Sequence, residues 1–293
     1  MTQPLPDVEQ KYIQTNDIRL HTIQSGPEDG PVVILLHGFP EFWRGWRKQI
    51  APLAKAGFRL IIPDQRGYNL SDKPSGVEPY RLEHLIADIL GIIETAGQQR
   101  VSLVGHDWGG IVAWEVAMQH PNRLRNLAIL NSPHPSVMRQ TLQRNPRQII
   151  SSSYGLFFQI PRFPEAWIKN NDFELLIRTL LKTSNPEAFT EEDLEYYREA
   201  WWQTGAMTAM LNWYRANFRY PPIFPQDVRI HIPTLIIWGA QDIALIESLA
   251  QDSLELCENG RLELFADATH WVQHEKHERI NEMLAGFLHV AGQ

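Results

Sequence analysis

The sequence predicts an α/β protein with a mostly parallel β-sheet, and three observations support this fold class. Continuous apolar runs, such as PVVILLHG at residues 31–38, are typical of strands that are buried on both faces. Amphipathic helical segments alternate with these runs, as in the right-handed crossovers of a parallel sheet. The alternation stops from residue 133 to about 226, where helical patterns rich in aromatic residues replace it. We therefore expect an α/β core interrupted by an inserted helical region.

The elements of the core follow one another along the chain. Residues 9–26 predict two short strands with a turn at residues 15–17. Buried strands are then expected at residues 31–37, 58–64, 100–106 and 124–131, and helices at residues 43–56, 81–97 and 109–120. Strands resume at 234–239 and 260–266, and one closing helix is expected over residues 274–290. This order assigns residues 1–132 and 227–293 to the core and residues 133–226 to a helical cap.

Composition excludes several classes of function. The chain has 293 residues, of which 43% are hydrophobic and 21% charged, and its net charge is -7. Because no cluster of basic residues is present, we expect no nucleic-acid partner. No apolar run reaches membrane-spanning length, and the first residues do not resemble a secretory signal. The single cysteine, Cys257, cannot form an internal disulfide, so we expect a cytoplasmic protein. The sequence leaves the oligomeric state open.

The stretch VGHDWGG at residues 104–110 joins a predicted buried strand to a helix. Gly105 and Gly109 flank Asp107, as expected of a nucleophile elbow, a sharp turn that raises the central side chain above the carboxyl edge of the sheet. A helix N-cap would also favour aspartate, but it does not need glycine on both sides directly after a buried strand. We therefore predict that Asp107 is the catalytic nucleophile.

A carboxylate nucleophile indicates a particular chemistry. With an ordinary pKa of about 3.9, Asp107 is ionised at neutral pH without a base. Attack on a saturated carbon gives a stable alkyl ester, so epoxides and carbon–halogen bonds are suitable substrates. Water must then attack the carbonyl group of this ester. We predict that the backbone N–H groups of Phe39, in HGFP, and Trp108 stabilise the resulting oxyanion.

The base and its orienting acid are predicted from chain order. His270, in DATHW, follows the last predicted strand and precedes the last helix, so we predict that it activates water. Asp242, in WGAQD, follows an earlier strand and is the expected orienting acid, although it could instead cap a helix starting in DIALIESLA. The competing position after the fourth buried strand holds Asn131, which carries no charge.

The other histidines are assigned no chemistry. His274 and His277 in HEKHE lack the H-E-x-x-H spacing of a zinc site, so we expect them to be solvated helix residues. His37 and His106 are expected to brace loops by hydrogen bonding.

The motifs HGFPE, GHDWGG, WGAQD and THW occur in this order. With them, nearly the whole chain resembles the α/β-hydrolase superfamily and, within it, the epoxide hydrolases. The resemblance implies an α/β-hydrolase fold in which residues 133–226 form the lid. It also implies that Tyr154 and Tyr214 hydrogen-bond the epoxide oxygen and protonate the developing alkoxide, as suits phenols. Phe39, Pro40 and Trp108 are expected to line the substrate pocket.

The expected reaction converts a small apolar epoxide and water into a vicinal diol, with no metal and no organic cofactor. Two alternatives remain at this stage. A dehalogenase would use the same nucleophile, histidine and acid. However, the dehalogenases that this chain resembles hold the halide or the substrate carboxylate with other residues at the positions of Phe39, Trp108 and Ile111. A hydrolase-like binding protein would have lost turnover, and the complete set of Asp107, Asp242 and His270 argues against it.

Overall fold

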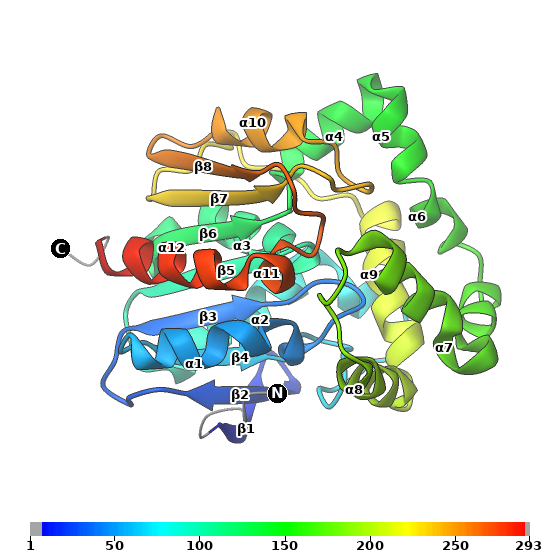
Figure 1. Cartoon of the computed structure of the whole chain (residues 1–293), viewed down its shortest axis with the longest axis horizontal. Coiled ribbons are helices and arrows are strands. Elements are labelled where there is room, and N and C mark those ends of the chain that lie inside the picture. Colours follow the sequence, from blue (N-terminus) through cyan, green and yellow to red (C-terminus); the bar gives the residue numbers. More distant parts are fainter. Residues whose placement is uncertain (1–7, 291–293) are drawn as a thin grey trace.

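The computed structural model describes residues 8–290 and contains an eight-stranded sheet in the order β1-β2-β4-β3-β5-β6-β7-β8 (Figure 1). β1 and β2 form an antiparallel hairpin, and β2 pairs antiparallel with β4. The remaining pairs are parallel. The strands are β1 (Glu9–Thr15), β2 (Ile18–Ser25), β3 (Val32–Leu36), β4 (Arg59–Pro63), β5 (Val101–His106), β6 (Leu124–Leu130), β7 (Thr234–Gly239) and β8 (Gly260–Phe265).

Helices cover both faces of this sheet, and β3 shows why its sequence is continuously apolar. Val33 and Leu35 point to the core cluster shared with α1 and α12, whereas Ile34 and Leu36 point to the cluster shared with α2 and α3. The prediction of a mostly parallel α/β sheet is confirmed. The core helices are η1 (Trp43–Trp46), α1 (Arg47–Lys55), η2 (Glu78–Tyr80), α2 (Leu82–Thr95), α3 (Trp108–Gln119), η3 (Pro121–Arg123), α10 (Ser248–Leu254), α11 (Val272–Glu275) and α12 (His277–Val290).

The prediction of one continuous closing helix was wrong. α11 ends at Glu275 and α12 begins at His277, because Lys276 between them leaves the helical conformation, with φ -115° and ψ 30°. The Glu275 carboxylate accepts hydrogen bonds from the backbone N–H and the hydroxyl of Thr269, which fixes α11 against the loop before it. Hydrophobic periodicity continues through this break, so the sequence pattern did not reveal it.

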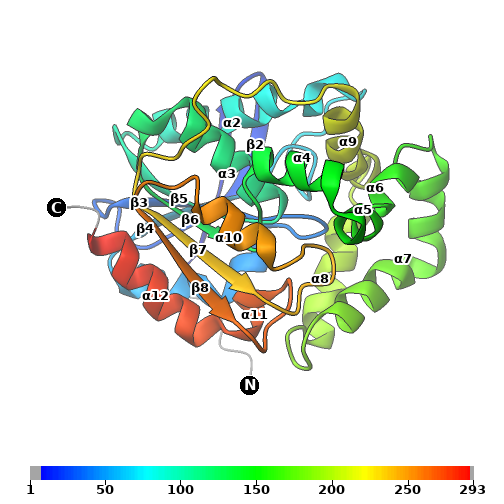
Figure 2. The same cartoon turned by 90° about the horizontal axis from the view of Figure 1, so that it is seen from above.

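Six helices lie between β6 and β7 and form the cap. They sit beyond the carboxyl ends of the parallel strands, on the side of the molecule away from the end of α12 (Figures 1 and 2). Thr190 and Asp193 form a reciprocal capping box at the N terminus of α8. The cap helices are α4 (Pro135–Arg144), α5 (Pro146–Ser151), α6 (Tyr154–Phe157), α7 (Phe163–Thr183), α8 (Glu191–Trp202) and α9 (Ala206–Arg219).

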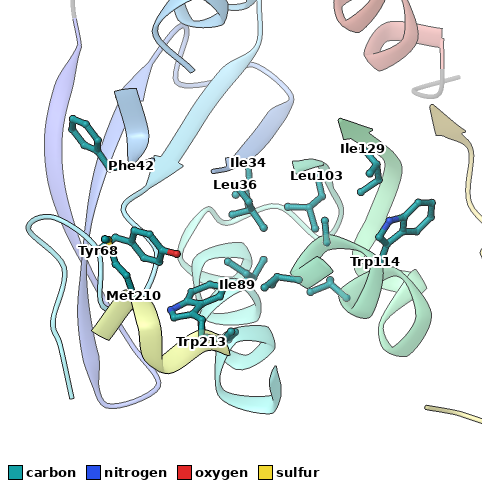
Figure 3. Close-up of a cluster of buried hydrophobic side chains, with 14 of the residues drawn as sticks. Ile34, Leu36, Phe42, Tyr68, Ile89, Leu103, Trp114, Ile129, Met210 and Trp213 are labelled. Carbon is teal, nitrogen blue, oxygen red and sulfur yellow. The ribbon is translucent and has the colours of Figure 1, made fainter. Parts of the chain in front are cut away.

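The cap helix α9 is anchored in the hydrophobic core. Met210 and Trp213 extend from α9 into the cluster that contains Tyr68 and the residues of β3 (Figure 3). The Tyr68 and Trp213 rings pack edge to face at 5.5 Å, and the indole of Trp213 donates a 2.9 Å hydrogen bond to the carbonyl of Arg66. The cap is therefore packed onto the core as well as tethered to it. In residues 8–290, no helix combines the length and apolarity needed to cross a membrane.

Candidate active site

Asp107 lies at the turn between β5 and α3 with a left-handed backbone, at φ 50° and ψ -120°. Its side chain makes no capping hydrogen bond to α3, so it does not act as a helix cap. Glycine is required at two positions near Asp107, because a side chain there would clash with neighbouring atoms. A Cβ on Gly38 would lie 2.3 Å from Asp107 Oδ1, and one on Gly109 would lie 2.3 Å from the carbonyl oxygen of Leu36. This strained turn has the geometry that the sequence predicts for a nucleophile elbow.

The Phe39 backbone reaches the predicted nucleophile directly. Its N–H donates a 2.7 Å hydrogen bond to Asp107 Oδ1, as expected of an oxyanion-hole donor. Trp108 is the first residue of α3, and within residues 8–290 its amide donates no hydrogen bond to the Asp107 carboxylate. The hydroxyl of Ser132 donates a 2.7 Å hydrogen bond to the backbone carbonyl of Asp107, which holds the turn from the β6 side.

His270 lies between two carboxylates. Its Nδ1 is 2.6 Å from Asp242 Oδ2, and its Nε2 is 3.7 Å from Asp107 Oδ2. Because a carboxylate accepts, the Nδ1–H donates to Asp242 and Nε2 faces the Asp107 carboxylate. Asp242 is not a helix cap, since α10 begins only at Ser248. The structure therefore brings the three predicted side chains together in the expected order.

Three further donors hold Asp242 in place. Its Oδ1 accepts from the backbone N–H groups of Ala244 and Leu245, at 2.8 and 3.0 Å. The Asn131 amide donates to Oδ2 at 2.9 Å, while its own oxygen accepts from Gly239. Asn131 was predicted only as a residue that could not supply charge, so its positioning role was missed. Its place after a buried strand, at the same sheet edge as Asp242, was the available signal.

The charges around His270 decide its protonation. Burial lowers the pKa of His270, but the charge and hydrogen bond of Asp242, with the charge of Asp107, raise it to about 9. Burial likewise raises the pKa of Asp242, yet His270, Asn131 and the Leu245 amide bring it below its ordinary value. At neutral pH the site therefore contains a protonated His270 paired with an ionised Asp242.

The two predicted cap tyrosines lie together above Asp107. Tyr154 begins α6 and Tyr214 lies in α9, with ring centroids 5.9 Å apart. Burial and the negative charge of Asp107 raise the pKa of both phenols, and for Tyr214 the neighbouring Tyr154 also contributes. Although 42% of Tyr154 is accessible, it lines two cavities, so part of that surface faces them rather than bulk solvent. Both phenols are therefore protonated at neutral pH and can donate.

Two cavities meet at these residues. The first has a volume of about 350 Å³ and the second about 480 Å³, and Asp107, Tyr154, Tyr214 and Leu245 line both. The first is also lined by Phe39, Pro40, Phe157, Phe158, Trp167 and His270. The second is also lined by Leu82, Trp108, Ile111, Met138, Leu142 and Phe224. The walls are mainly apolar, and the polar groups gather where the cavities meet.

A buried network lies behind the site. Glu41, at the end of HGFPE, accepts hydrogen bonds from Tyr197 at 2.6 Å and from Gln273 at 3.0 Å, and its Oε1 is 2.7 Å from His274 Nε2. His106 Nδ1 lies 3.3 Å from Glu41 Oε2, and its Nε2 donates a 2.9 Å hydrogen bond to the carbonyl of His270, which connects this network to the loop that contains His270.

The expectation that His274 is solvated was wrong. His274 is buried, and Arg47, which can only donate, lies 2.8 Å from its Nδ1. Nε2 therefore carries the proton that bonds Glu41. Burial and the charge of Arg47 lower the pKa of His274 to about 4, although Glu41 opposes the shift. The role of Glu41 was also missed, although HGFPE was singled out as a motif.

The sheet order, the elbow carboxylate after β5, the acid after β7 and the histidine after β8 define an α/β-hydrolase. The family model described as alpha/beta hydrolase fold matches residues 31–277. The chain belongs to the epoxide hydrolase family of this superfamily.

Relatives that support this family membership match the chain over nearly its whole length. It is 38% identical to Epoxide hydrolase 2 of Caenorhabditis elegans, over 95% of this chain and 79% of that protein. It is 45% identical to the AB hydrolase superfamily protein YfhM of Bacillus subtilis, over 95% and 97% of the two chains. A crystal structure of Bacillus megaterium epoxide hydrolase with an inhibitor superposes with a TM-score of 0.87 at 33% identity, covering 95% of this chain and all of that one.

Proposed function

We propose that this protein hydrolyses an apolar epoxide to a vicinal diol. The observation that carries the proposal is that two protonated phenols, Tyr154 and Tyr214, lie with the Asp107 carboxylate where the two apolar cavities meet. An epoxide needs both parts: a nucleophile for its carbon and a proton donor for its oxygen.

In the first step, Asp107 attacks an epoxide carbon and forms an ester bond while the carbon–oxygen bond breaks. The Tyr154 and Tyr214 phenols hydrogen-bond the departing oxygen, and a proton from this pair completes its hydroxyl group. The hydrogen bond between the Phe39 N–H and Asp107 Oδ1 orients the carboxylate, so that Oδ2, nearer to His270, is the oxygen that attacks.

In the second step, His270 removes a proton from a water molecule as the water attacks the ester carbonyl of Asp107. Formation of the ester removes the negative charge of Asp107, which is one of the charges that raise the pKa of His270. Alkylation thus shifts His270 toward the neutral form that can act as a base. The Phe39 and Trp108 amides stabilise the oxyanion. Its collapse breaks the bond to the diol oxygen, which takes the proton that His270 removed from water. The proton of the resulting Asp107 carboxylic acid replaces the one that the phenol pair donated in the first step, which restores the Asp107 carboxylate.

Product analysis tests the reaction class. The purified protein is incubated separately with styrene oxide, fluoroacetate and a chloroalkane, and diol and halide are measured. We expect diol from styrene oxide and no halide from the other two. Halide release without diol formation would support the dehalogenase instead, a reading in which Trp108, a wall of the second cavity, would bind the halide.

Trapping tests the covalent step and the non-catalytic alternative. The variant His270→Gln should accumulate an alkyl ester on Asp107 when it is mixed with styrene oxide, as detected by mass spectrometry of the peptide that contains residue 107. An Asp107→Asn, His270→Gln double variant is the matched control and should give no adduct. If neither protein is alkylated and the wild type forms no diol, the binding-protein alternative is favoured.

We also propose a cellular location for the protein, the cytoplasm. The single cysteine, Cys257, is partly buried, and burial raises the pKa of its thiol to about 12. An unreactive lone thiol is compatible with the cytoplasmic location that we propose.

A further inference from the structure

The cap exposes a large apolar surface that neither the fold nor the proposed reaction explains. Ile150 is 72% accessible and Leu156 61% accessible. Contiguous exposed apolar surfaces of this kind mark interaction sites, whereas single exposed residues do not. We define the cap patch as Ile149, Ile150, Leu156, Ile160, Phe163 and Trp167, all of which are exposed.

The cap patch lies on three consecutive helices of the cap, α5, α6 and α7, and on the turn before α7. Phe163 and Trp167 of α7 both pack on Phe157 of α6, with ring centroids 6.0 and 5.1 Å apart. α5 connects to α6 through tight turns, in which the N–H of Ser153 bonds the carbonyl of Ile150. In Figure 1, α5, α6 and α7 lie along the side of the cap that faces away from α12.

The segment that carries the cap patch is basic, although the chain is acidic. Residues 133–171 contain five basic residues and one acidic residue, a net charge of +4, against -7 for the whole chain. The acidic residue, Glu165, is buried and bonded to Arg215 at 2.6 Å. The arginines are exposed, and no ion pair within residues 8–290 involves them: Arg139, Arg144, Arg147 and Arg162.

The cap patch also adjoins both cavities of the site. Trp167 belongs to the patch and lines the first cavity. Arg139, Leu142 and Gln143 of α4 line the second cavity, at the basic end of the same segment. An apolar molecule held at this surface would therefore be next to the routes into the site.

We propose that the cap patch docks this protein on an anionic lipid surface. The apolar side chains would enter the headgroup region, and the arginines would face lipid phosphates, as in other interfacial helices that combine aromatic and basic residues. A second copy of this chain is a poorer occupant. A two-fold contact would set the same basic rim against itself, and like charges would repel.

Vesicle sedimentation with the full chain tests the proposal. One set of vesicles contains equal parts of phosphatidylcholine and phosphatidylglycerol, and the other contains phosphatidylcholine alone. We expect the protein to pellet with the anionic vesicles, to bind the neutral vesicles far more weakly, and to be released from the anionic vesicles by high salt. Because each arginine near the surface contributes roughly fivefold to binding, the double variant Arg147→Gln, Arg162→Gln should bind about 25-fold more weakly.

A second double variant, with a matched control, tests the contribution of the apolar side chains of the cap patch to vesicle binding. Ile150→Gln with Leu156→Gln should weaken binding by roughly tenfold or more, because two inserted side chains are lost. Leu181→Gln changes an exposed leucine at the far end of α7, outside the basic segment, and should bind like the wild type. Far-UV circular dichroism and thermal unfolding establish that each variant is folded.

Three results would overturn the proposal. They are equal binding to neutral and anionic vesicles, no binding to either, and binding that both double variants retain. If sedimentation velocity instead shows self-association that the apolar double variant abolishes, and vesicles are not bound, the patch is a contact between copies of the chain. None of these readings depends on the reaction that the protein catalyses.

Discussion

The Tyr197 phenol of the cap donates a 2.6 Å hydrogen bond to the Glu41 carboxylate of the core. Both residues are fully buried, and Trp201, one turn further along α8, donates a 2.6 Å hydrogen bond to the carbonyl of Pro40. Helix α8 thus holds two consecutive residues of the loop whose Phe39 N–H reaches Asp107. The cap therefore positions the predicted oxyanion hole as well as covering the cavities.

Replacing Tyr197 with phenylalanine should destabilise the protein but leave the loop that contains Glu41 in place. Glu41 is buried, yet His274 and His106 keep the pKa of its carboxyl group well below the ordinary value. Each hydrogen-bond donor to this buried carboxylate therefore helps to stabilise its negative charge. Loss of one donor should lower the free energy of unfolding by about 1–3 kcal/mol, measured by urea denaturation. Tyr196→Phe on the exposed side of α8 is the control, because the ring over Arg44 remains. Equal stability of the two variants would contradict the role of this hydrogen bond.

The two reaction steps should respond differently to pH. His270 must be neutral to activate water, and its pKa should fall below about 9 once Asp107 is esterified. The rate of ester hydrolysis should therefore rise with pH and level off above that lower pKa, whereas alkylation needs no neutral histidine. Rapid-quench mass spectrometry of the alkyl-enzyme measures both rates. Hydrolysis that slows between about pH 6 and about pH 8 would be incompatible with His270 as the base.

Removing the phenols should slow the first step selectively. The double variant Tyr154→Phe, Tyr214→Phe should alkylate roughly 10²- to 10⁴-fold more slowly, and each single variant should lose less because one donor remains. Single-turnover kinetics with styrene oxide provides the measurement. Tyr220→Phe, at the exposed end of α9, is the control and should be unaffected. A double variant that alkylates at the normal rate would exclude both phenols as the acid.

Gly38→Ala should displace the nucleophile, because the added methyl group would lie 2.3 Å from Asp107 Oδ1. We expect a large loss of ester formation and a loss of stability of about 1–3 kcal/mol from overpacking. Gly286→Ala in α12 is the matched control. Its added methyl group meets no atom within 4 Å, so it should be stable or gain roughly 0.5–1 kcal/mol from helix propensity. An active Gly38→Ala variant would show that Asp107 does not need this close approach.

Local sequence predicted the elements that carry the site. The apolar run before Asp107 and the glycines around it specify a buried strand and a sharp turn within a few residues, so they can be read without the rest of the chain. Chain order also predicted that Asp242 and His270 meet at one edge of the sheet, because parallel strands end at the same edge, and the structure has them 2.6 Å apart there. Tyr154 and Tyr214 came from the resemblance alone.

Other features depend on packing between distant segments. Glu41 and His274 are 233 residues apart, and Glu41 and Tyr197 are 156 apart. No periodicity encodes these pairings. The same holds for the break at Lys276 and for the two cavities between cap and core.

The sequence by itself determined the order of the elements along the chain, the sharp turn after β5 and the carboxylate at its centre, because each depends on neighbouring residues. Only the tertiary structure decided which polar side chains are buried together behind that carboxylate. Burial and the protonation that follows from it are set by side chains that meet after folding.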